Sequence, residues 1–200
     1  VFVLDKNAGR VLKSFIPEAK NPASLSSSQI DVFFQDSRGT IWLGDSRDNQ
    51  FGLYRLNQAE DGFTHYTHVT GDSTSISSNE MRFIAEDGKQ RLWIGTDGGL
   101  NLYNHDENKF TQFTDGKLSS VQGFTTDKQG EPWFATYSSG GLVSVDAEKR
   151  IITSYDETKG LLHNDLDPGG LTGIIAKDDF GRFWLPSRRG LSVFDPETKT

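Results

Sequence analysis

Residues Ile84–Tyr103, IAEDGKQRLWIGTDGGLNLY, contain the pattern that decides the fold of this chain. An apolar run is followed by an Asp turn, a Trp-centred strand, a Gly-Leu pair and a second apolar strand. The same order recurs around each of the four Trp residues, and each Trp follows an Asp by six positions. These pairs are Asp36 with Trp42, Asp87 with Trp93, Asp127 with Trp133, and Asp178 with Trp184. Successive Trp residues lie 51, 40 and 51 positions apart, which indicates a repeat protein with a unit of about forty residues.

The composition favours an all-β repeat. The 200 residues include 14 Phe, 5 Tyr and 21 Gly but one Met, and aromatic, glycine-rich chains with frequent turns form sheets more readily than helical arrays. The formal charge of −7 disfavours nucleic acid and anionic membranes as partners. No apolar run approaches the roughly 20 residues that span a bilayer, so no direct membrane contact and no signal peptide are expected here. The absence of Cys excludes disulfides and thiolate chemistry in this chain.

Each unit is expected to be a meander of four antiparallel strands, which we call strands a to d. Strand a is apolar on both faces, as at Val32–Phe34, and such a sheet must be covered on both faces. Sheets stacked as blades around an axis satisfy this requirement, so we predict a β-propeller. The expected blades are residues 1–20 (partial), 29–68, 79–113, 120–155 and 166–200 (partial). With three complete and two partial blades, the chain is expected to be a segment of a larger ring.

The repeated Asp and Trp residues are interpreted as structural. Each Trp occupies one register of strand b, which favours packing between blades over stacking on a ligand. Each Asp begins a turn that in three repeats carries a Gly three positions later, so capping of the turn is favoured over metal binding or acid–base catalysis. In the fourth unit Pro186 removes a ladder donor, and strand b is expected to bend or end there.

The motif carried by Glu86–Asp87, Leu92–Thr96 and Gly99–Tyr103 resembles the two-component regulator propeller repeat. Residues 36–44, 127–136 and 178–187 are weaker copies, with departures at Gln90, Ala135, Pro186 and the basic pair Arg188–Arg189. The resemblance implies a seven-bladed propeller that forms the periplasmic sensing part of membrane-bound histidine kinases or diguanylate cyclases. Several such receptors are linked to carbohydrate use.

The titratable residues give little indication of catalysis. The chain has four His residues, His65, His68, His105 and His163. The first two are expected on opposite faces of strand d, and His105 in a solvated hairpin, whereas His163 lies in a loop between repeats, where propellers open their binding face. Neither a Ser-His-Asp arrangement nor a phosphate-binding loop nor a metal motif is present. We therefore expect no catalytic residue, no metal and no cofactor in this chain.

A ligand is expected at the central opening, where the a-strands begin and the b–c and d–a loops meet. The candidate ligand-binding residues are Asp31, Arg47, Asn49, Asn79, Arg82, Gln122, Tyr137, His163, Asn164, Arg188 and Arg189. Arg, Asn and Asp together with an aromatic residue suit a sugar, and paired Arg residues suit a uronic or sulfated one. At any single position, an ordinary solvated loop residue is an equal alternative to a ligand-binding one.

The favoured hypothesis is an extracytoplasmic sensor module that recognises an oligosaccharide. Its partners would be that ligand, a histidine kinase or diguanylate cyclase output domain, and a second receptor chain in a homodimer, since a stiff propeller signals through how two chains associate. Two alternatives stay open: a scaffold for protein–protein interaction, and a propeller lyase acting on polysaccharides or cyclic peptide lactones.

Overall fold

The computed structural model describes residues 1–200 except 19, 27–29, 31, 46–51, 138–139 and 168–174. Within that part of the chain the strands form five antiparallel sheets, and the strands of each sheet follow one another in sequence order. Two short 3₁₀ helices, η1 (Gly116–Leu118) and η2 (Glu157–Lys159), are the helical elements among these residues. None is long and apolar enough to cross a membrane.

The strand bounds are as follows. The N-terminal hairpin holds β1 (Phe2–Asp5) and β2 (Arg10–Ser14). The first sheet holds β3 (Val32–Gln35), β4 (Ile41–Gly44), β5 (Leu53–Leu56) and β6 (Phe63–Tyr66). The second holds β7 (Met81–Glu86), β8 (Leu92–Thr96), β9 (Gly99–Asn104) and β10 (Lys109–Phe113). The third holds β11 (Val121–Thr126), β12 (Pro132–Thr136), β13 (Leu142–Asp146) and β14 (Ile151–Tyr155). The fourth holds β15 (Ala176–Lys177), β16 (Phe183–Ser187) and β17 (Gly190–Phe194).

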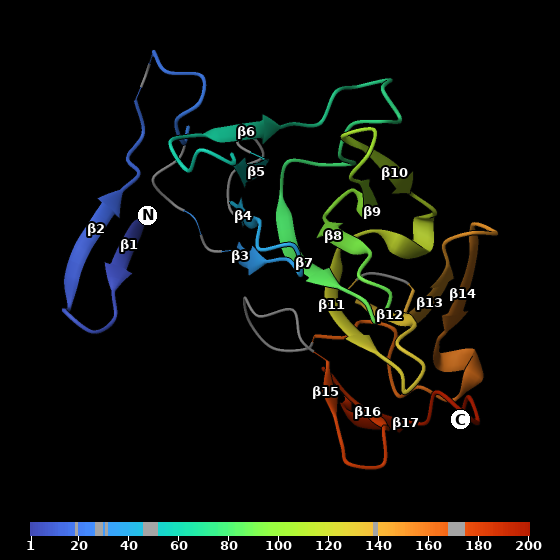
Figure 1. Cartoon of the computed structure of the whole chain (residues 1–200). Coiled ribbons are helices and arrows are strands. Elements are labelled where there is room, and N and C mark those ends of the chain that lie inside the picture. Colours follow the sequence, from blue (N-terminus) through green and yellow to red (C-terminus); the bar gives the residue numbers. More distant parts are fainter. Residues whose placement is uncertain (19, 27–29, 31, 46–51, 138–139, 168–174) are drawn as a thin grey trace.

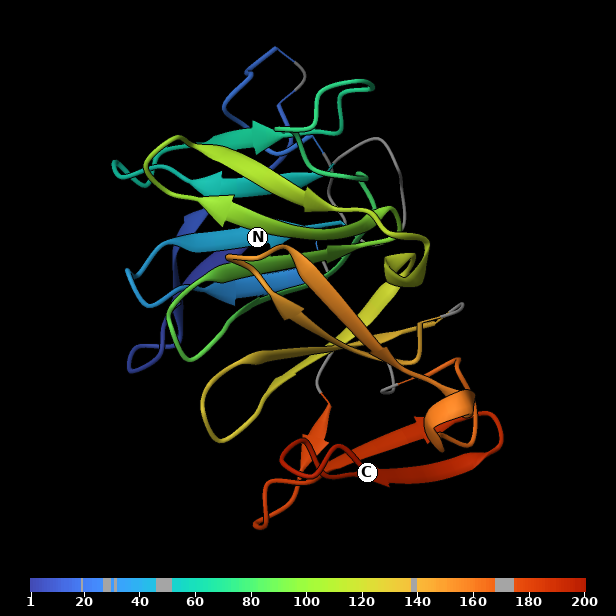
Figure 2. The same ribbon diagram turned by 90° about the vertical axis from the view of Figure 1, so that its right-hand side faces the viewer.

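The sheets are arranged as the blades of a propeller. Strand β7 packs against both β3 and β11, and Figure 1 shows these first strands near the centre with the fourth strands at the periphery. The view turned by 90° shows the sheets stacked on one another (Figure 2). The prediction of an all-β propeller with complete four-stranded and partial blades is therefore confirmed.

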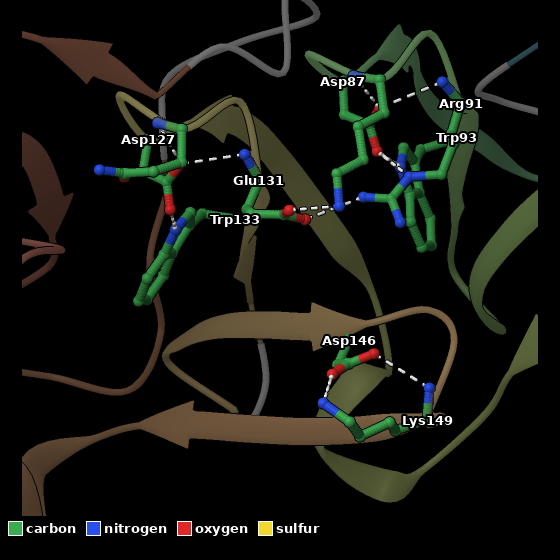
Figure 3. Close-up of polar contacts among 10 residues, drawn as sticks. Asp87, Arg91, Trp93, Asp127, Glu131, Trp133, Asp146 and Lys149 are labelled. Carbon is green, nitrogen blue, oxygen red and sulfur yellow. Dashed lines mark hydrogen bonds and ion pairs between the residues drawn. The ribbon is translucent and has the colours of Figure 1, made fainter.

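Each repeat turn is held by its Asp carboxylate. In the second repeat Asp87 Oδ1 accepts hydrogen bonds from the backbone N–H groups of Lys89 and Arg91 at 2.9 and 3.1 Å. Its Oδ2 accepts from the indole Nε1 of Trp93 at 2.8 Å and from Arg91 Nε at 2.6 Å. Figure 3 shows this arrangement beside its counterpart at Asp127. The Asp–Trp hydrogen bond occurs in all four repeats, at 2.8, 2.8, 3.1 and 3.1 Å.

Each Trp that is followed by another sheet is buried against it. Trp42 meets Tyr103 of the second sheet with ring centroids 4.8 Å apart, and Trp93 meets Phe134 of the third at 5.2 Å. Trp133 meets Phe183 of the fourth sheet at 5.6 Å. Trp184 departs from the prediction of packing between blades, because it is 36% exposed with no sheet against its face among the described residues.

Strand a of the first sheet is covered on one face only. Val32 is buried, but Phe33 is 61% exposed, contrary to the expectation that both faces are covered. The reason is the neighbouring sheet: the β1–β2 hairpin has two strands where the complete sheets have four, so in the described part of the chain no inner strand lies against Phe33.

A glycine is required where strand c begins. Gly141 has φ +65°, and a Cβ at this position would lie 2.3 Å from the carbonyl oxygen of Tyr155 at the end of strand d. Gly99 has φ +144°, and its Cβ would lie 2.7 Å from the carbonyl oxygen of Phe113. The Gly-Leu pair thus marks the place where strand c passes closest to strand d, and a side chain there would separate the two strands.

One departure from the repeat motif, Ala135, has a structural explanation. In the second sheet Gly95 faces Phe83, and a Cβ on the glycine would lie 2.1 Å from the ring. In the third sheet the glycine lies on strand a and the larger residue on strand b, because Gly123 faces Ala135. The expectation that strand b ends at Pro186 is wrong, because β16 continues through Pro186 to Ser187, and the register partner of Pro186 is Leu191.

Removing the turn carboxylate of a buried repeat is expected to be costly. In an Asp87→Ala variant two turn amides and the buried Trp93 indole lose their acceptor, so the free energy of unfolding should fall by about 3 kcal/mol. Asp178→Ala is the matched control, because its Trp184 is partly exposed and water can replace the acceptor. Urea denaturation followed by fluorescence measures both. Equal losses in the two variants would contradict the role given to the buried indole.

Gln90 stands where the other three turns carry Gly, and it adopts a left-handed φ of +60°. Gln90→Gly should therefore raise the free energy of unfolding by up to about 1 kcal/mol. The reciprocal Gly39→Gln change should lower it by about 1 kcal/mol, since Gly39 has φ +81° and space for a side chain. Thermal denaturation of the two variants tests this pair. A gain in stability from both substitutions would contradict it.

Candidate ligand-binding site

A row of polar residues runs across three sheets at the end where the a-strands begin and the b-strands finish. Arg82, Ser120 and Gln122 lie at the beginnings of β7 and β11. Asp97, Tyr137 and Arg188 each follow the Trp of their own repeat by four positions, one residue past strand b. We call these six residues, Arg82, Asp97, Ser120, Gln122, Tyr137 and Arg188, the rim.

The rim begins with an ion pair in the second sheet. Arg82 donates from Nε to Asp97 Oδ1 and from Nη2 to Asp97 Oδ2, each at 2.6 Å. The same Nη2 lies 3.3 Å from Glu80 Oε2. The side chains of Arg82 and Asp97 are 27% and 35% exposed, so the bidentate pair is partly shielded from water. Such planar two-point pairing is stronger than a single contact between point charges.

Ser120 connects the second sheet to the third. Its N–H donates to the carbonyl oxygen of Asp97, and its Oγ donates to Asp97 Oδ1, both at 3.0 Å. Gln122 Nε2 donates to Ser120 Oγ at 2.8 Å, and the Tyr137 N–H donates to the Ser120 carbonyl at 3.1 Å. One residue thus joins both sheets through its backbone and its side chain.

The backbone of Ser120 is in the left-handed region, with φ +52°. The other described residues with positive φ that are not glycine lie in turns, where this conformation is common: Glu60, Gln90, Asn108 and Arg150 in hairpins, and Lys199 in the turn after β17. Ser120 lies instead at the start of an inner strand. Strain at a site held by several hydrogen bonds is a reason to propose function there.

The rim ends at the fourth sheet. Arg188 donates from Nη2 to the Tyr137 hydroxyl, and its guanidinium carbon lies 5.4 Å from the centroid of the Tyr137 ring. This contact spans the third and fourth sheets, because Tyr137 follows β12 and Arg188 follows β16. The rim is therefore one connected series of contacts from Arg82 to Arg188.

The pKa of Asp97 is lowered from its usual 3.8. Burial acts to raise this pKa, but the hydrogen bonds with Arg82 and Glu80, the charge of Arg82 and the hydrogen bond from Ser120 outweigh it. Asp97 is consequently ionised at neutral pH, and so Arg82 keeps its partner.

The remaining predicted site residues have other surroundings. Asn79 Oδ1 accepts from the backbone N–H of His68 at 2.6 Å. His163 Nδ1 accepts from the Asp165 N–H at 3.0 Å, and Asn164 Oδ1 accepts from the Glu157 N–H at 2.7 Å, so both order their own loop. Arg189 is exposed beside Arg188. Asp31, Arg47 and Asn49 lie outside the described residues.

Sequence reasoning missed Asp97 and Ser120. For Asp97 a signal was present, since it follows Trp93 by the same four positions that separate Tyr137 and Arg188 from their Trp residues. For Ser120 no local signal exists, because its conformation and its contact with Asp97 arise only when two sheets meet.

A cavity of about 970 Å³ lies away from the rim, between the N-terminal hairpin and the first sheet. It is lined by residues that include Phe2, Phe33, Arg38 and His105, and it occupies the side where the two-stranded hairpin lacks inner strands. His105 is partly buried rather than solvated as predicted, and its Nε2 is buried without a hydrogen-bond partner among the described residues. Burial, followed by the charge of Arg38, lowers the pKa of His105.

In the described part of the chain, no group of three or more His, Asp or Glu side chains is placed to hold a metal ion. The four repeat carboxylates are engaged with turn amides and indoles, as shown above. The rim is thus a surface for hydrogen bonding, charge pairing and ring contact.

The fold and the repeated Asp–Trp hydrogen bond define a β-propeller built from short sequence repeats. Residues 75–98 match the family model of the two component regulator propeller. The chain therefore contains a repeat of the two-component regulator propeller type, in agreement with the motif carried by residues 84–103.

Known proteins agree with this assignment. The chain is 32% identical to histidine kinase P4 of Formosa agariphila over 99% of its own length and 14% of the kinase. It is similar in structure to the extracellular domain of the putative one component system BT4673 from B. thetaiotaomicron, with 28% identity and a TM-score of 0.68 over 86% of this chain and 24% of that one. The chain therefore spans about a seventh of the length of the kinase and about a quarter of the length of the BT4673 domain.

The propeller is also found in enzymes. Virginiamycin B lyase from Staphylococcus aureus matches with a TM-score of 0.56 and 15% identity over 84% of this chain and 56% of the lyase. At this level of identity the likeness shows a shared fold and carries no inference about chemistry.

The ion pair at the rim makes a prediction about pH. Removing the guanidinium in an Arg82→Met variant takes away both the hydrogen bonds and the charge of Arg82 that lower the pKa of Asp97, so this pKa should rise. In the unchanged protein, the stability that Asp97 contributes is present above pH 3.8 and is lost as pH falls through its lowered pKa. Carboxyl ¹³C NMR titration measures both proteins. The pKa of Asp146, lowered by contacts with Lys149, is the internal control and should not change. An Asp97 pKa unaltered by the substitution would contradict the ion pair.

Proposed function

We propose that this chain is an extracytoplasmic ligand-sensing module of a two-component-type receptor, and that its ligand is an oligosaccharide bound at the rim. The observation that carries the proposal is the connected row of polar contacts across three sheets, with Ser120 held in a left-handed conformation at its middle. Rigid sheets position this row, so a ligand that touches several of them meets preorganised groups.

The chemistry of the rim suits hydroxyl-rich ligands. The Asp97 carboxylate accepts hydrogen bonds, the Gln122 amide both donates and accepts, and the Tyr137 hydroxyl and ring provide a donor and an apolar face. Sugars present both hydroxyl groups and apolar ring faces. A mixture of this kind therefore matches a sugar better than it matches a purely apolar or a highly charged molecule.

The relatives support the wider assignment. One is named a histidine kinase, and another is the extracellular domain of a putative one component system. By analogy, the parent protein would place this propeller in the periplasm and pass the signal to a kinase or diguanylate cyclase output domain, with two receptor chains acting as a homodimer.

Two other functions are less well supported. A lyase would need an acid or base at the site. No His residue belongs to the described rim, and His105 lines the separate cavity. A protein-docking scaffold would use an exposed apolar patch. The exposed apolar residues include Phe2 and Leu4 on the hairpin and Leu191 and Val193 on β17, at the two ends of the stack rather than at the rim.

A thermal-shift screen against neutral, uronic and sulfated oligosaccharides tests the sensor. A ligand that binds only the folded protein stabilises it by about 2.7 kcal/mol at a hundredfold excess over its dissociation constant. A shift with a glycan that is recovered intact supports sensing, whereas loss of that glycan during incubation supports the lyase. No shift with any glycan would contradict the proposal.

The Arg188→Ala/Arg189→Ala double variant locates the site. Binding of any glycan found in the screen should be lost, because Arg188 forms the fourth-sheet end of the rim. Thermal stability without ligand should change little, since Arg189 is exposed and surface positions contribute little to stability. The matched control is Lys149→Ala/Arg150→Ala, an exposed basic pair in a hairpin turn between β13 and β14. Unchanged affinity in the first variant would remove these residues from the site.

A further inference from the structure

The fourth-sheet end of the rim carries two guanidinium groups that form no ion pair among the described residues. Three other arginines of these sheets each pair with an Asp carboxylate: Arg82, Arg91 and Arg182, at 2.6, 2.6 and 2.8 Å. Arg188 and Arg189 are exposed and have no such partner in the described part of the chain. A negatively charged group of a ligand can therefore neutralise them.

Two acidic residues lie close to this end of the rim. Asp165 and Asp167 run beside β16, because Leu166 between them forms a β-bridge with Ser187. Neither carboxylate forms an ion pair with either arginine in the part of the chain that the structure describes. An anion that binds the arginines thus has no ion pair to break, but it must be recognised by direct contact with a guanidinium rather than by attraction at long range.

The two arginines differ in how they are held. Arg188 donates from Nη2 to the Tyr137 hydroxyl, and its guanidinium carbon lies 5.4 Å from the centroid of the Tyr137 ring. Tyr137 is fixed in turn, because its N–H donates to the Ser120 carbonyl at 3.1 Å. The hydrogen bond to Tyr137 uses one N–H of the guanidinium and leaves the others to donate. Arg189 bonds to Ser187 Oγ through its backbone N–H, at 3.3 Å, and its side chain forms no hydrogen bond among the described residues.

A guanidinium presented in this way suits an oxyanion. Its planar fork donates two parallel N–H bonds to a carboxylate or a sulfate, which a lysine ammonium cannot reproduce. Because Tyr137 already restricts Arg188, binding costs less side-chain entropy than it would at a freely moving arginine. Further along the rim, Gln122 uses one amide hydrogen on Ser120 Oγ and keeps its other hydrogen and its carbonyl oxygen for sugar hydroxyls. The rim thus offers hydroxyl contacts at the third sheet and an oxyanion contact at the fourth.

We propose that the fourth-sheet end of the rim is an oxyanion subsite, in which Arg188 binds the carboxylate or sulfate group of an acidic oligosaccharide. This inference rests on the proposed function, and it narrows the ligand to sugars that carry such a group. From the sequence, this preference is expected of the pair Arg188–Arg189 as a whole. Here it depends on Arg188, the member of the pair whose guanidinium is held by Tyr137.

Matched ligands test the subsite by isothermal titration calorimetry. Neutral hexasaccharides of galactose, mannose and glucose are each compared with the same chain whose non-reducing terminal sugar is oxidised at C6 to the uronic acid or carries a 6-sulfate. In at least one series an acidic member should bind at least about tenfold more tightly than the neutral one, a difference of about 1.4 kcal/mol. The acidic member with the higher affinity distinguishes a carboxylate from a sulfate ligand. A smaller advantage in every series would overturn this inference while leaving the sensor function in place. Binding of no member of any series would instead overturn the proposed function, and this inference with it.

Two single variants locate the subsite on one of the neighbouring arginines. Arg188→Gln removes the held guanidinium, so the ratio of acidic to neutral affinity should fall by about tenfold. Arg189→Gln is the matched control, because it removes the same charge one residue away, and the ratio should fall by less than about twofold, as for an exposed charge. Thermal denaturation without ligand confirms that both variants fold. Equal falls in the two variants would attribute the preference to the overall charge of the protein and contradict a subsite at Arg188.

Discussion

The hydrogen bond between a turn Asp and the indole of the Trp six residues later is the interaction on which the rest of this structure depends. One carboxylate oxygen holds the amides of the turn, and the other fixes the orientation of the Trp side chain. The indole then presents its ring to the next sheet, where an aromatic residue covers it. A local hairpin and a contact between sheets are thus joined through one side chain. Because buried carboxylates require compensating donors, the turn, the indole and the sheet interface form together.

This arrangement sets the position of the candidate site. In the second, third and fourth repeats strand b begins at the Asp turn and ends one residue before the rim position, so the length of the strand from Trp to rim is the same in these three. Asp97, Tyr137 and Arg188 consequently occupy equivalent places on neighbouring sheets although their chemistry differs. The scaffold demands little of these positions, and this leaves them free to carry recognition. The sheets are stiff, and Ser120 ties two of them together at the point where a ligand would bind.

The same fold supports sensors and lyases, so the architecture alone does not separate them. The composition of the described rim helps to distinguish a sensor from a lyase. It combines an ion pair, an amide, a phenol and a stacked guanidinium, and its titratable group Asp97 is held ionised rather than poised near neutral pH. Catalytic acids and bases are usually tuned toward the pH at which they work, whereas a binding surface benefits from a charge state that stays constant.

The sequence by itself determined the repeat, the strand order and the Asp turns, because these depend on residues close together in the chain. The spacing of the Trp residues and the Gly-Leu pairs is sufficient to predict four-stranded units, and the left-handed turn at Gln90 and the close strand approach at Gly99 explain the positions at which glycine is preferred. Sequence reasoning also identified Arg82, Gln122, Tyr137 and Arg188 as candidates, since each lies at a strand end with a polar side chain. Only the tertiary structure decided that Arg82 is paired with Asp97, that Ser120 bridges two sheets, and that Phe33 and Trp184 are uncovered. These features depend on which sheet lies against which, and on contacts between residues that a local pattern of apolar and polar side chains does not relate to each other.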